Sequence, residues 1–216
     1  MATARKWSNV AVAIQSALAT AITINSISKA NPGSIGYTGT DPSNGDYVLL
    51  SANGMFQLNN RVARVTNENG VGNTFDLENI NTTSFDTFTS GTGQVITFGT
   101  SITTATTITP SGGDFGFIDT STIHSNVKTQ IPGPTEAIRF DMDHIWDVSD
   151  AGLLALKAAY DSQSMLAVKF TIGTGGPVVV FAGYIGAHLL PGGQSQGLVT
   201  TKTTFTVYGS PTYYSS

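Results

Sequence analysis

The sequence predicts a mainly β protein: a β-sandwich or barrel with one flanking α-helix, joined to a second, small β-barrel. Three observations carry this prediction. Before residue 149, almost every segment is a short β-type run bounded by Gly, Asn, Asp or Pro. One stretch alone, beginning near Ser149, has apolar residues at helical spacing. Residues 178–209 hold two long β-type runs separated by a polar, Gly-rich stretch, a pattern typical of a hairpin.

The composition indicates a surface that is largely covered by other protein. The chain has 216 residues, and only 11% of them are charged, against about 25% in an ordinary soluble domain. So few charges favour self-association, although a monomeric β-protein with an uncharged polar coat would have the same composition. The net charge of −4 argues against nucleic-acid binding, and the absence of cysteine excludes a disulfide framework and a thiolate zinc site.

The first 21 residues have some features of a secretory signal. Arg5 and Lys6 precede an apolar run, and Ala-Leu-Ala follows at residues 17–19. However, the uninterrupted apolar run covers only residues 10–14, whereas the hydrophobic region of a signal needs about 7–15 residues. We therefore expect residues 1–21 to be retained, as an N-terminal arm and first strand that belong with the C-terminal part of the chain.

Residues 22–99 predict a small closed β-barrel. Short strands recur at intervals of about 10–15 residues, with turn residues between them. The segment "NENGVGN" (residues 67–73) predicts a hairpin loop in which Gly70 and Gly72 take positive φ. After this barrel, we expect a Thr-rich connection over residues 101–113, then a strand that leads into a long polar loop over residues 118–137.

The run "AIRFDMDHIWD" (residues 137–147) predicts a strand with two different faces. Alternation places Arg139, Asp141, Asp143 and Asp147 on a mostly acidic face. The opposite, apolar face carries Ile138, Phe140, Met142, His144 and Trp146.

A helix follows this strand. We expect Ser149 at its N-cap and Asp150 in its first turn, where a carboxylate favours the exposed N–H groups. Leu153, Leu156 and Tyr160 form one apolar stripe that would pack on a sheet.

The two arms of the C-terminal hairpin differ. The first, residues 178–190, is apolar on both faces and must therefore be covered on both sides. In the second, one face carries the core-type residues Thr203, Phe205 and Val207, and the other carries Lys202, Thr204, Thr206 and Tyr208. We expect residues 210–216 beyond it to be poorly ordered in a free subunit.

No motif of catalysis or of metal or cofactor binding stands out. In "FDMDH" (residues 140–144), alternation turns His144 away from Asp141 and Asp143, so a core histidine is favoured over a metal site. The Gly clusters do not open a helix, and therefore lack the dipole that a phosphate loop needs. We expect no enzyme, no cofactor and no bound metal.

Residues 22–99 resemble a β-barrel module of phage virion proteins, and also the FCCH module of ubiquitin-activating enzymes. The match is carried by "NGD", "GMFQL", "RVARVTN" and "NTFDLENINTTSFD", at residues 44–46, 54–58, 61–67 and 73–86. The module itself is not catalytic in those proteins, so the resemblance implies a fold and no activity.

Residues 1–21 and 100–216 together resemble the major tail tube protein of long-tailed bacteriophages with non-contractile tails. The resemblance lies in the order of elements, at residues 150–160, 167–177, 181–185, 194–197 and 201–211. It implies a tail-tube core, interrupted by residues 22–99 as an inserted module. It also implies stacked hexameric rings that form a tube, made in the host cytoplasm, without a membrane partner. The implied protein partners are the chain itself and the tape measure, terminator and distal tail proteins.

The same resemblance suggests which residues face the tube lumen, through which DNA passes without specific binding. We expect a lumen that is net acidic or uncharged and polar, because like charge keeps phosphates from sticking. The candidates are Asp141, Asp143, Thr204 and Thr206, although alternation alone would also allow Asp141 and Asp143 to face bulk solvent. The predicted core comprises Phe140, Met142, Trp146, Leu153, Leu156, Phe205 and Val207. Two other functions stay open: another tail ring protein of the same fold, such as a terminator or baseplate component, and a surface-binding adhesin.

Overall fold

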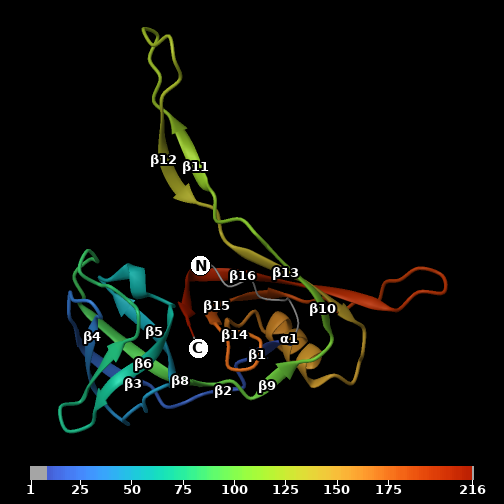
Figure 1. Ribbon diagram of the computed structural model, residues 1–216, viewed down its shortest axis with the longest axis horizontal. Helices are drawn as coiled ribbons and strands as arrows, with labels where there is room; N and C mark the ends of the chain where they lie inside the picture. Colours follow the sequence, from blue (N-terminus) through green and yellow to red (C-terminus); the bar gives the residue numbers. More distant parts are fainter. Residues whose placement is uncertain (1–8, 216) are drawn as a thin grey trace.

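The computed structural model describes residues 9–215 and is mainly β, as predicted (Figure 1). It contains two seven-stranded sheets, a two-stranded arm and one α-helix. Every strand pair is antiparallel. The predicted N-terminal arm is described only from Asn9 onward, because residues 1–8 lie outside the described part.

The first sheet curls around on itself. Its strand order is β10-β13-β16-β15-β14-β1-β9. The edge strands β9 and β10 are joined by residues 103–104 alone, so the two edges of the sheet must lie close together. The bounds are β1 (Val10–Ile14), β9 (Thr100–Ile102), β10 (Ala105–Ser111), β13 (Arg139–Ile145), β14 (Leu166–Ile172), β15 (Val178–Gly186) and β16 (Thr200–Tyr214).

The expectation of a mere connection over residues 101–113 is wrong. This segment supplies both edge strands, β9 and β10. The physical reason is that threonine is β-branched, and a run of β-branched residues fits a pleated, half-buried strand.

Helix α1 (Ala151–Asp161) packs against the inner side of this curled sheet. Its N-cap is Asp150, not Ser149: the Asp150 carboxylate accepts a hydrogen bond from the Leu153 N–H at 2.8 Å. Ser149 instead donates its hydroxyl to the carboxylate of Asp147 at 2.7 Å. Both residue types are good caps, and this competing contact decides between them.

The core between helix and sheet contains most of the residues expected there. Met142, Leu153, Leu156, Phe205 and Val207 are buried in one cluster. Phe140 is half-buried and stacks on Phe181 with ring centroids 4.9 Å apart. Trp146 lies just beyond the end of β13, half-buried, and its indole N–H donates to the carbonyl of Leu189 at 2.9 Å.

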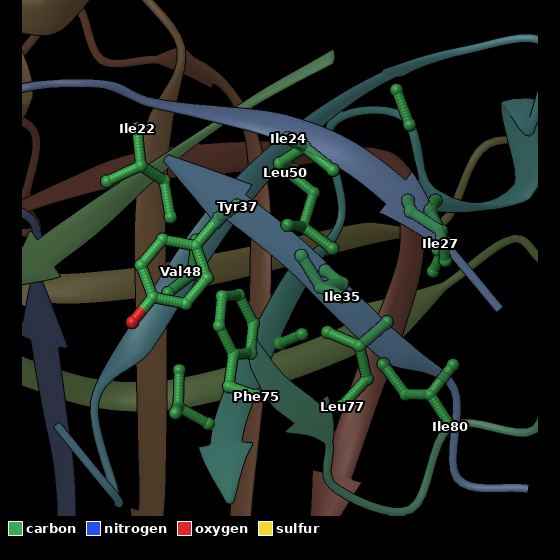
Figure 2. Close-up of a cluster of buried hydrophobic side chains, with 14 of the residues drawn as sticks. Ile22, Ile24, Ile27, Ile35, Tyr37, Val48, Leu50, Phe75, Leu77 and Ile80 are labelled. Carbon is green, nitrogen blue, oxygen red and sulfur yellow. The ribbon is translucent and has the colours of Figure 1, made fainter. Parts of the chain in front are cut away.

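The second sheet forms a small barrel around its own core (Figure 2). Six strands follow the order β8-β3-β4-β7-β6-β5, and pairing of β5 with β8 closes the circle, while β2 adds to β8 at one edge. The buried core side chains come from β3, β4, β5, β6 and β7, and Val95 of β8 packs against them; they include Ile24, Tyr37, Leu50 and Phe75. The bounds are β2 (Ala17–Leu18), β3 (Ile22–Ile27), β4 (Ser34–Thr38), β5 (Tyr47–Asn53), β6 (Val62–Asn69), β7 (Thr74–Leu77) and β8 (Ser90–Thr97), with a 3₁₀ turn, η1, at Phe56–Leu58.

The hairpin loop between β6 and β7 does not use its glycines as predicted. Positive φ falls on Asn67 (49°) and Asn73 (48°), and neither Gly70 nor Gly72 adopts it. Asparagine tolerates the left-handed region because its short polar side chain can bond locally, and Asn67 does so with Asp76 at 3.0 Å.

The barrel covers the outer face of β14 and β15. Val178, Val180 and Ala182 of β15 are buried there against Val62 and Ile96 of the barrel. The opposite face of β15 packs in the helix core through Phe181 and Ile185, so residues 178–183 are covered on both faces, as their composition requires. Beyond them Tyr184 is 47% exposed, so the expected cover on both sides does not extend over the whole run of residues 178–190. Ala167 of β14 and Tyr214 of β16 complete the contact.

The C-terminal end of β16 is bonded to the barrel, contrary to the expected disorder of residues 210–216. The Thr212 hydroxyl donates to the carbonyl of Val62 at 2.9 Å, and the Tyr214 hydroxyl accepts from the Arg64 N–H at 2.6 Å. The guanidinium of Arg64 lies over the Tyr214 ring, 4.4 Å from its centroid. Burial raises the pKa of Tyr214 to about 12.

The expected long loop over residues 118–137 is instead part of a protruding arm. Strands β11 (Phe115–Asp119) and β12 (Gln130–Thr135) pair and point away from both sheets (Figure 1). Every residue from 114 to 137 is exposed apart from Gly133, which is half-buried. At its root, Gly112 and Gly113 have φ of 76° and 85°, a conformation that favours glycine.

We predict that Tyr214→Phe lowers the free energy of unfolding by about 0.5–1.5 kcal/mol, because the Arg64 N–H loses its acceptor in a buried contact. Chemical unfolding followed by circular dichroism measures this. Tyr213→Phe is the matched control, since Tyr213 is 63% exposed and its loss of a hydroxyl should leave the midpoint unchanged. Equal unfolding midpoints for the two variants would show that the hydrogen bond between Arg64 and Tyr214 does not stabilise the fold.

Candidate lumen-facing surface

One polar surface extends over β10, β13 and β16, on the side of the sheet that faces away from α1. Residues directly opposite in an antiparallel pair share a face, and the register opposes Asp141 to Thr204, Arg139 to Thr206 and Asp143 to Lys202. The four lumen candidates named from the sequence, Asp141, Asp143, Thr204 and Thr206, therefore lie on one surface. On the same surface, β10 adds Thr109 beside Asp141 and Thr107 beside Asp143.

Asp141 is the best-connected carboxylate of this polar surface. It accepts a hydrogen bond from the Thr204 hydroxyl at 2.7 Å, and its other oxygen lies 3.2 Å from the ammonium of Lys202. The Thr204 hydrogen bond first, and Lys202 second, hold the pKa of Asp141 below its ordinary value. The carboxylate is thus kept ionised and fixed in direction by its neighbours on β16.

The charges of the polar surface cancel. Asp141 and Asp143 alternate with Arg139 on the same strand, and Lys202 stands opposite Asp143. Two acids and two bases give a local sum of zero. The surface is therefore hydroxyl-rich and charge-balanced, and it is not net acidic.

His144 lies on the other side of β13, directly beneath the polar surface. It is fully buried, and its two ring nitrogens hydrogen-bond to hydroxyls: Nδ1 to Thr104 at 3.2 Å and Nε2 to Thr203 at 2.7 Å. Burial lowers the pKa of His144, in spite of the nearby Asp143 and Asp150, which oppose this shift. In the described residues, no group of three or more His, Cys, Asp or Glu side chains is arranged to hold a metal ion.

The sequence interpretation missed part of this surface. Thr107 and Thr109 were hidden because residues 101–113 have no strong apolar alternation, although a β-branched run was the available signal. Tyr184 and Tyr208 form an edge-on ring pair, with centroids 6.0 Å apart, at the end of the polar surface near β15. Their contact depends on the register of β15 with β16, which the sequence does not reveal.

A sequence model of a phage tail tube protein family matches residues 53–216. The chain belongs to the phage tail tube protein family. A search of curated proteins finds no significant match. The family match starts within β5, so it includes the second half of the barrel formed by residues 22–97, and the comparisons give no support for the likeness of that barrel to the FCCH module.

Family membership identifies this tail tube protein as a structural component of a phage virion tail, of a class whose members associate with themselves and with other tail proteins. The exposed, hydroxyl-rich polar surface over β10, β13 and β16 agrees with a structural role. Within residues 9–215, no helix is long and apolar enough to cross a lipid bilayer.

We predict that the stability of this tail tube protein decreases as the pH falls below about 6.5, through His144. A depressed folded-state pKa means that the unfolded chain takes up a proton first, so stability is present above the ordinary histidine pKa and is lost as the pH falls. The slope for one proton is at most about 1.4 kcal/mol per pH unit.

Unfolding midpoints between pH 7.5 and 5 test this prediction. His144→Gln should flatten the pH dependence, whereas His124→Gln, in an exposed part of the arm, should leave it as in the wild type. An unchanged slope in His144→Gln would show that other groups produce the acid sensitivity.

Proposed function

We propose that this protein forms hexameric rings that stack into the tube of a non-contractile phage tail, and that DNA passes through this tube into the host. Rings assembled in the host cytoplasm would meet the tape measure protein inside and the terminator and distal tail proteins at the ends. The polar surface over β10, β13 and β16 would line the lumen, with Asp141, Asp143, Thr204 and Thr206 facing the DNA.

The observation that carries this proposal is that β10, the outermost strand of the polar surface, has an open edge. Its sequence, ATTITPS, has no charged residue and a single proline, Pro110, close to its end, and its outer edge pairs with no other strand in the described chain. Natural proteins usually blunt such edges with charges or cover them, because they pair with other chains. Pairing of the edge with the next subunit would extend the polar surface from one subunit to the next and leave no open edge.

The chemistry of the polar surface suits a channel for DNA. Each base on it has an acidic neighbour, so phosphates find no cluster of free positive charge that would bind them with release of counterions. Hydroxyls of Thr204, Thr206, Thr107 and Thr109 keep the wall wetted without adding charge.

The barrel formed by residues 22–97 would then stand beside the lumen wall. A register shift between Val180 and Ala182, with Gly209 at φ 87° in the opposite strand, breaks the regular pairing of β15 with β16 where the polar surface ends and the barrel contact begins. The polar side chains stay uncovered by the barrel. We propose that the barrel projects from the tube exterior or fills a gap between rings, and that it forms a module with limits at residues 22 and 99.

We predict that the purified protein forms rings and tubes as its concentration is raised. Negative-stain electron microscopy over a range of protein and salt concentrations provides the test. Single rings that never stack would favour a terminator or baseplate component. Monomers under all conditions would contradict the proposal and favour the adhesin.

The lumen assignment is tested with Asp141→Lys plus Asp143→Lys in phage. The double variant removes both acids from beside Arg139 and Lys202, so the wall becomes strongly basic and should bind phosphates, which slows DNA ejection. The matched control is Asp86→Lys plus Asp161→Lys, two exposed acids outside the polar surface, with the same change in net charge. Ejection rates measured by DNA release should fall for the first pair alone; normal ejection in both would place Asp141 and Asp143 on the exterior.

A further inference from the structure

An apolar groove with a volume of about 650 Å³ opens on the curled sheet, away from α1. In the described part of the chain, none of the residues that line it is charged or belongs to α1, and eight of the ten are apolar or aromatic. Phe140 and Phe170 line it with ring centroids 5.4 Å apart, and the exposed Tyr213 lies beside them. A concave apolar surface of this size is of the kind that binds a ligand or a protein segment.

A second hollow adjoins this groove and extends to the point where the described chain begins. It has a volume of about 470 Å³ and is lined by residues of β1, β9 and β10, together with Asn9. The groove and the hollow share Thr106 and Ile108 of β10. A segment that leaves Asn9 along the hollow therefore reaches the groove.

Asn9 turns the chain at the edge of the groove. Its φ is 57°, in the left-handed region, so the extended conformation of β1 does not continue through it. Its carbonyl accepts a hydrogen bond from the Gly173 N–H at 3.2 Å, and Val10 pairs with Ile172, which lines the groove. Trp7 is two residues before Asn9, and two residues of chain span up to about 7 Å. The groove is therefore within reach of the Trp7 side chain.

We propose that residues 1–8, MATARKWS, dock into this groove of their own chain, with the indole of Trp7 as the anchor. Aromatic rings pack well in offset or edge-to-face contacts, and Phe140, Phe170 and Tyr213 offer three rings to an indole. The chain's own segment is the occupant because it is tethered at the edge of the groove. A tether of two residues gives Trp7 a high effective concentration there, which no separate partner has.

The charges of the segment fit the surroundings of the groove. Arg5 and Lys6 precede the tryptophan, and the described lining is uncharged, so both cations stay at the rim. Two exposed acids lie at the root of the arm, where the Glu136 N–H donates to the carbonyl of Asp114 at 2.9 Å. Glu136 is two residues from Ile138, which lines the groove. Two bases of the segment thus meet two acids, a modest but favourable pairing.

The proposed contact covers side chains that the described chain leaves partly exposed. Ile108, Ile138 and Val179 are half-buried at the groove, and each also packs against the helix core. Docking would close this core at the end away from α1. The contact is made by side chains, so it does not require the backbone edge of β10 that the proposed function gives to the next subunit. It concerns a single chain and does not rest on the proposed function.

Tryptophan fluorescence provides the first test, in protein too dilute to assemble. The chain has two tryptophans, so Trp146→Phe leaves Trp7 as the single reporter. A docked indole emits at shorter wavelength than tryptophan in water, and it resists quenching by acrylamide. Emission from Trp7 that matches free tryptophan in water would overturn the proposal.

A groove variant and a matched control locate the docked indole. In the Trp146→Phe background, Pro110→Asp with Tyr213→Asp puts two charges at the groove, and both residues are exposed, so folding should survive, as circular dichroism will check. The emission should move to longer wavelength, and the quenching constant should rise several-fold. The control, Phe56→Asp with Val71→Asp, adds the same charge on exposed sites of the barrel and should change neither. Equal spectra for the two variants would place Trp7 elsewhere.

Crosslinking tests whether the occupant belongs to the same chain, because the chain has no cysteine. Ala4→Cys with Tyr213→Cys, treated with a short bismaleimide, should give a crosslink within one chain, detected by mass spectrometry. The same pair with Trp7→Ser keeps the tether and removes the anchor, so the yield should fall at least about tenfold. Equal yields with and without Trp7 would overturn the proposal. So would crosslinks that join light and heavy chains in a mixture of unlabelled and ¹⁵N-labelled protein, since these would assign the groove to a second copy.

Discussion

The structure depends on one constraint: β15 is apolar on both faces and has to be buried on both. Phe181 and Ile185 on one face take part in the core with α1, while Val178 and Val180 on the other face pack against the small barrel. Full burial of a valine side chain is worth about 1.5–3 kcal/mol, so exposure of the second face would cost several such contributions. The barrel is consequently part of the fold of the tail tube core, and its position follows from the composition of a single strand.

The barrel that covers β15 also contacts its two neighbouring strands, β14 and β16. Lys169 of β14 turns toward the barrel, where its ammonium lies 5.3 Å from the ring centroid of Tyr47 and 4.9 Å from that of Phe98. Burial there lowers the pKa of Lys169. Tyr214 meets the barrel at the end of β16 and is held by the backbone of Arg64. Lys169 and Tyr214, at the edge of the apolar contact, thus hold the barrel against the curled sheet. In the sequence, the barrel and the sheet are connected only where the chain enters the barrel and where it leaves it.

Much of this could be predicted from the sequence where a strong apolar pattern is present. The alternation over residues 138–147 predicted a strand with a polar and an apolar face, and the stripe of Leu153 and Leu156 predicted the helix. The edge strand β10 was missed because an edge strand of a curled sheet needs little apolar surface, and Ile108 is its one large aliphatic residue. The arm was taken for a loop because it makes no core, and an exposed hairpin of this kind has no apolar alternation that would reveal its strands in the sequence.

Other features depend on contacts that no local pattern encodes. The charge balance of the polar surface follows from the register that sets Asp143 opposite Lys202. The choice of Asp150 over Ser149 as helix cap depends on Asp147 two residues before Ser149. An apolar groove lined by residues of β10, β13, β14, β15 and β16 likewise exists only because these five strands come together when the sheet curls.

The two chain crossings into the barrel have a consequence for how such a protein could change over generations. The entry and exit lie side by side, with the Ser16 N–H bonded to the Thr97 carbonyl at 2.8 Å, so the barrel could be gained or lost at a single junction. Ala167, Val178, Val180 and Ala182 nevertheless now depend on it for cover. A descendant that discarded the barrel would need polar replacements at several of these positions at the same time. Loss of the barrel in a single event would expose the outer faces of β14 and β15 together.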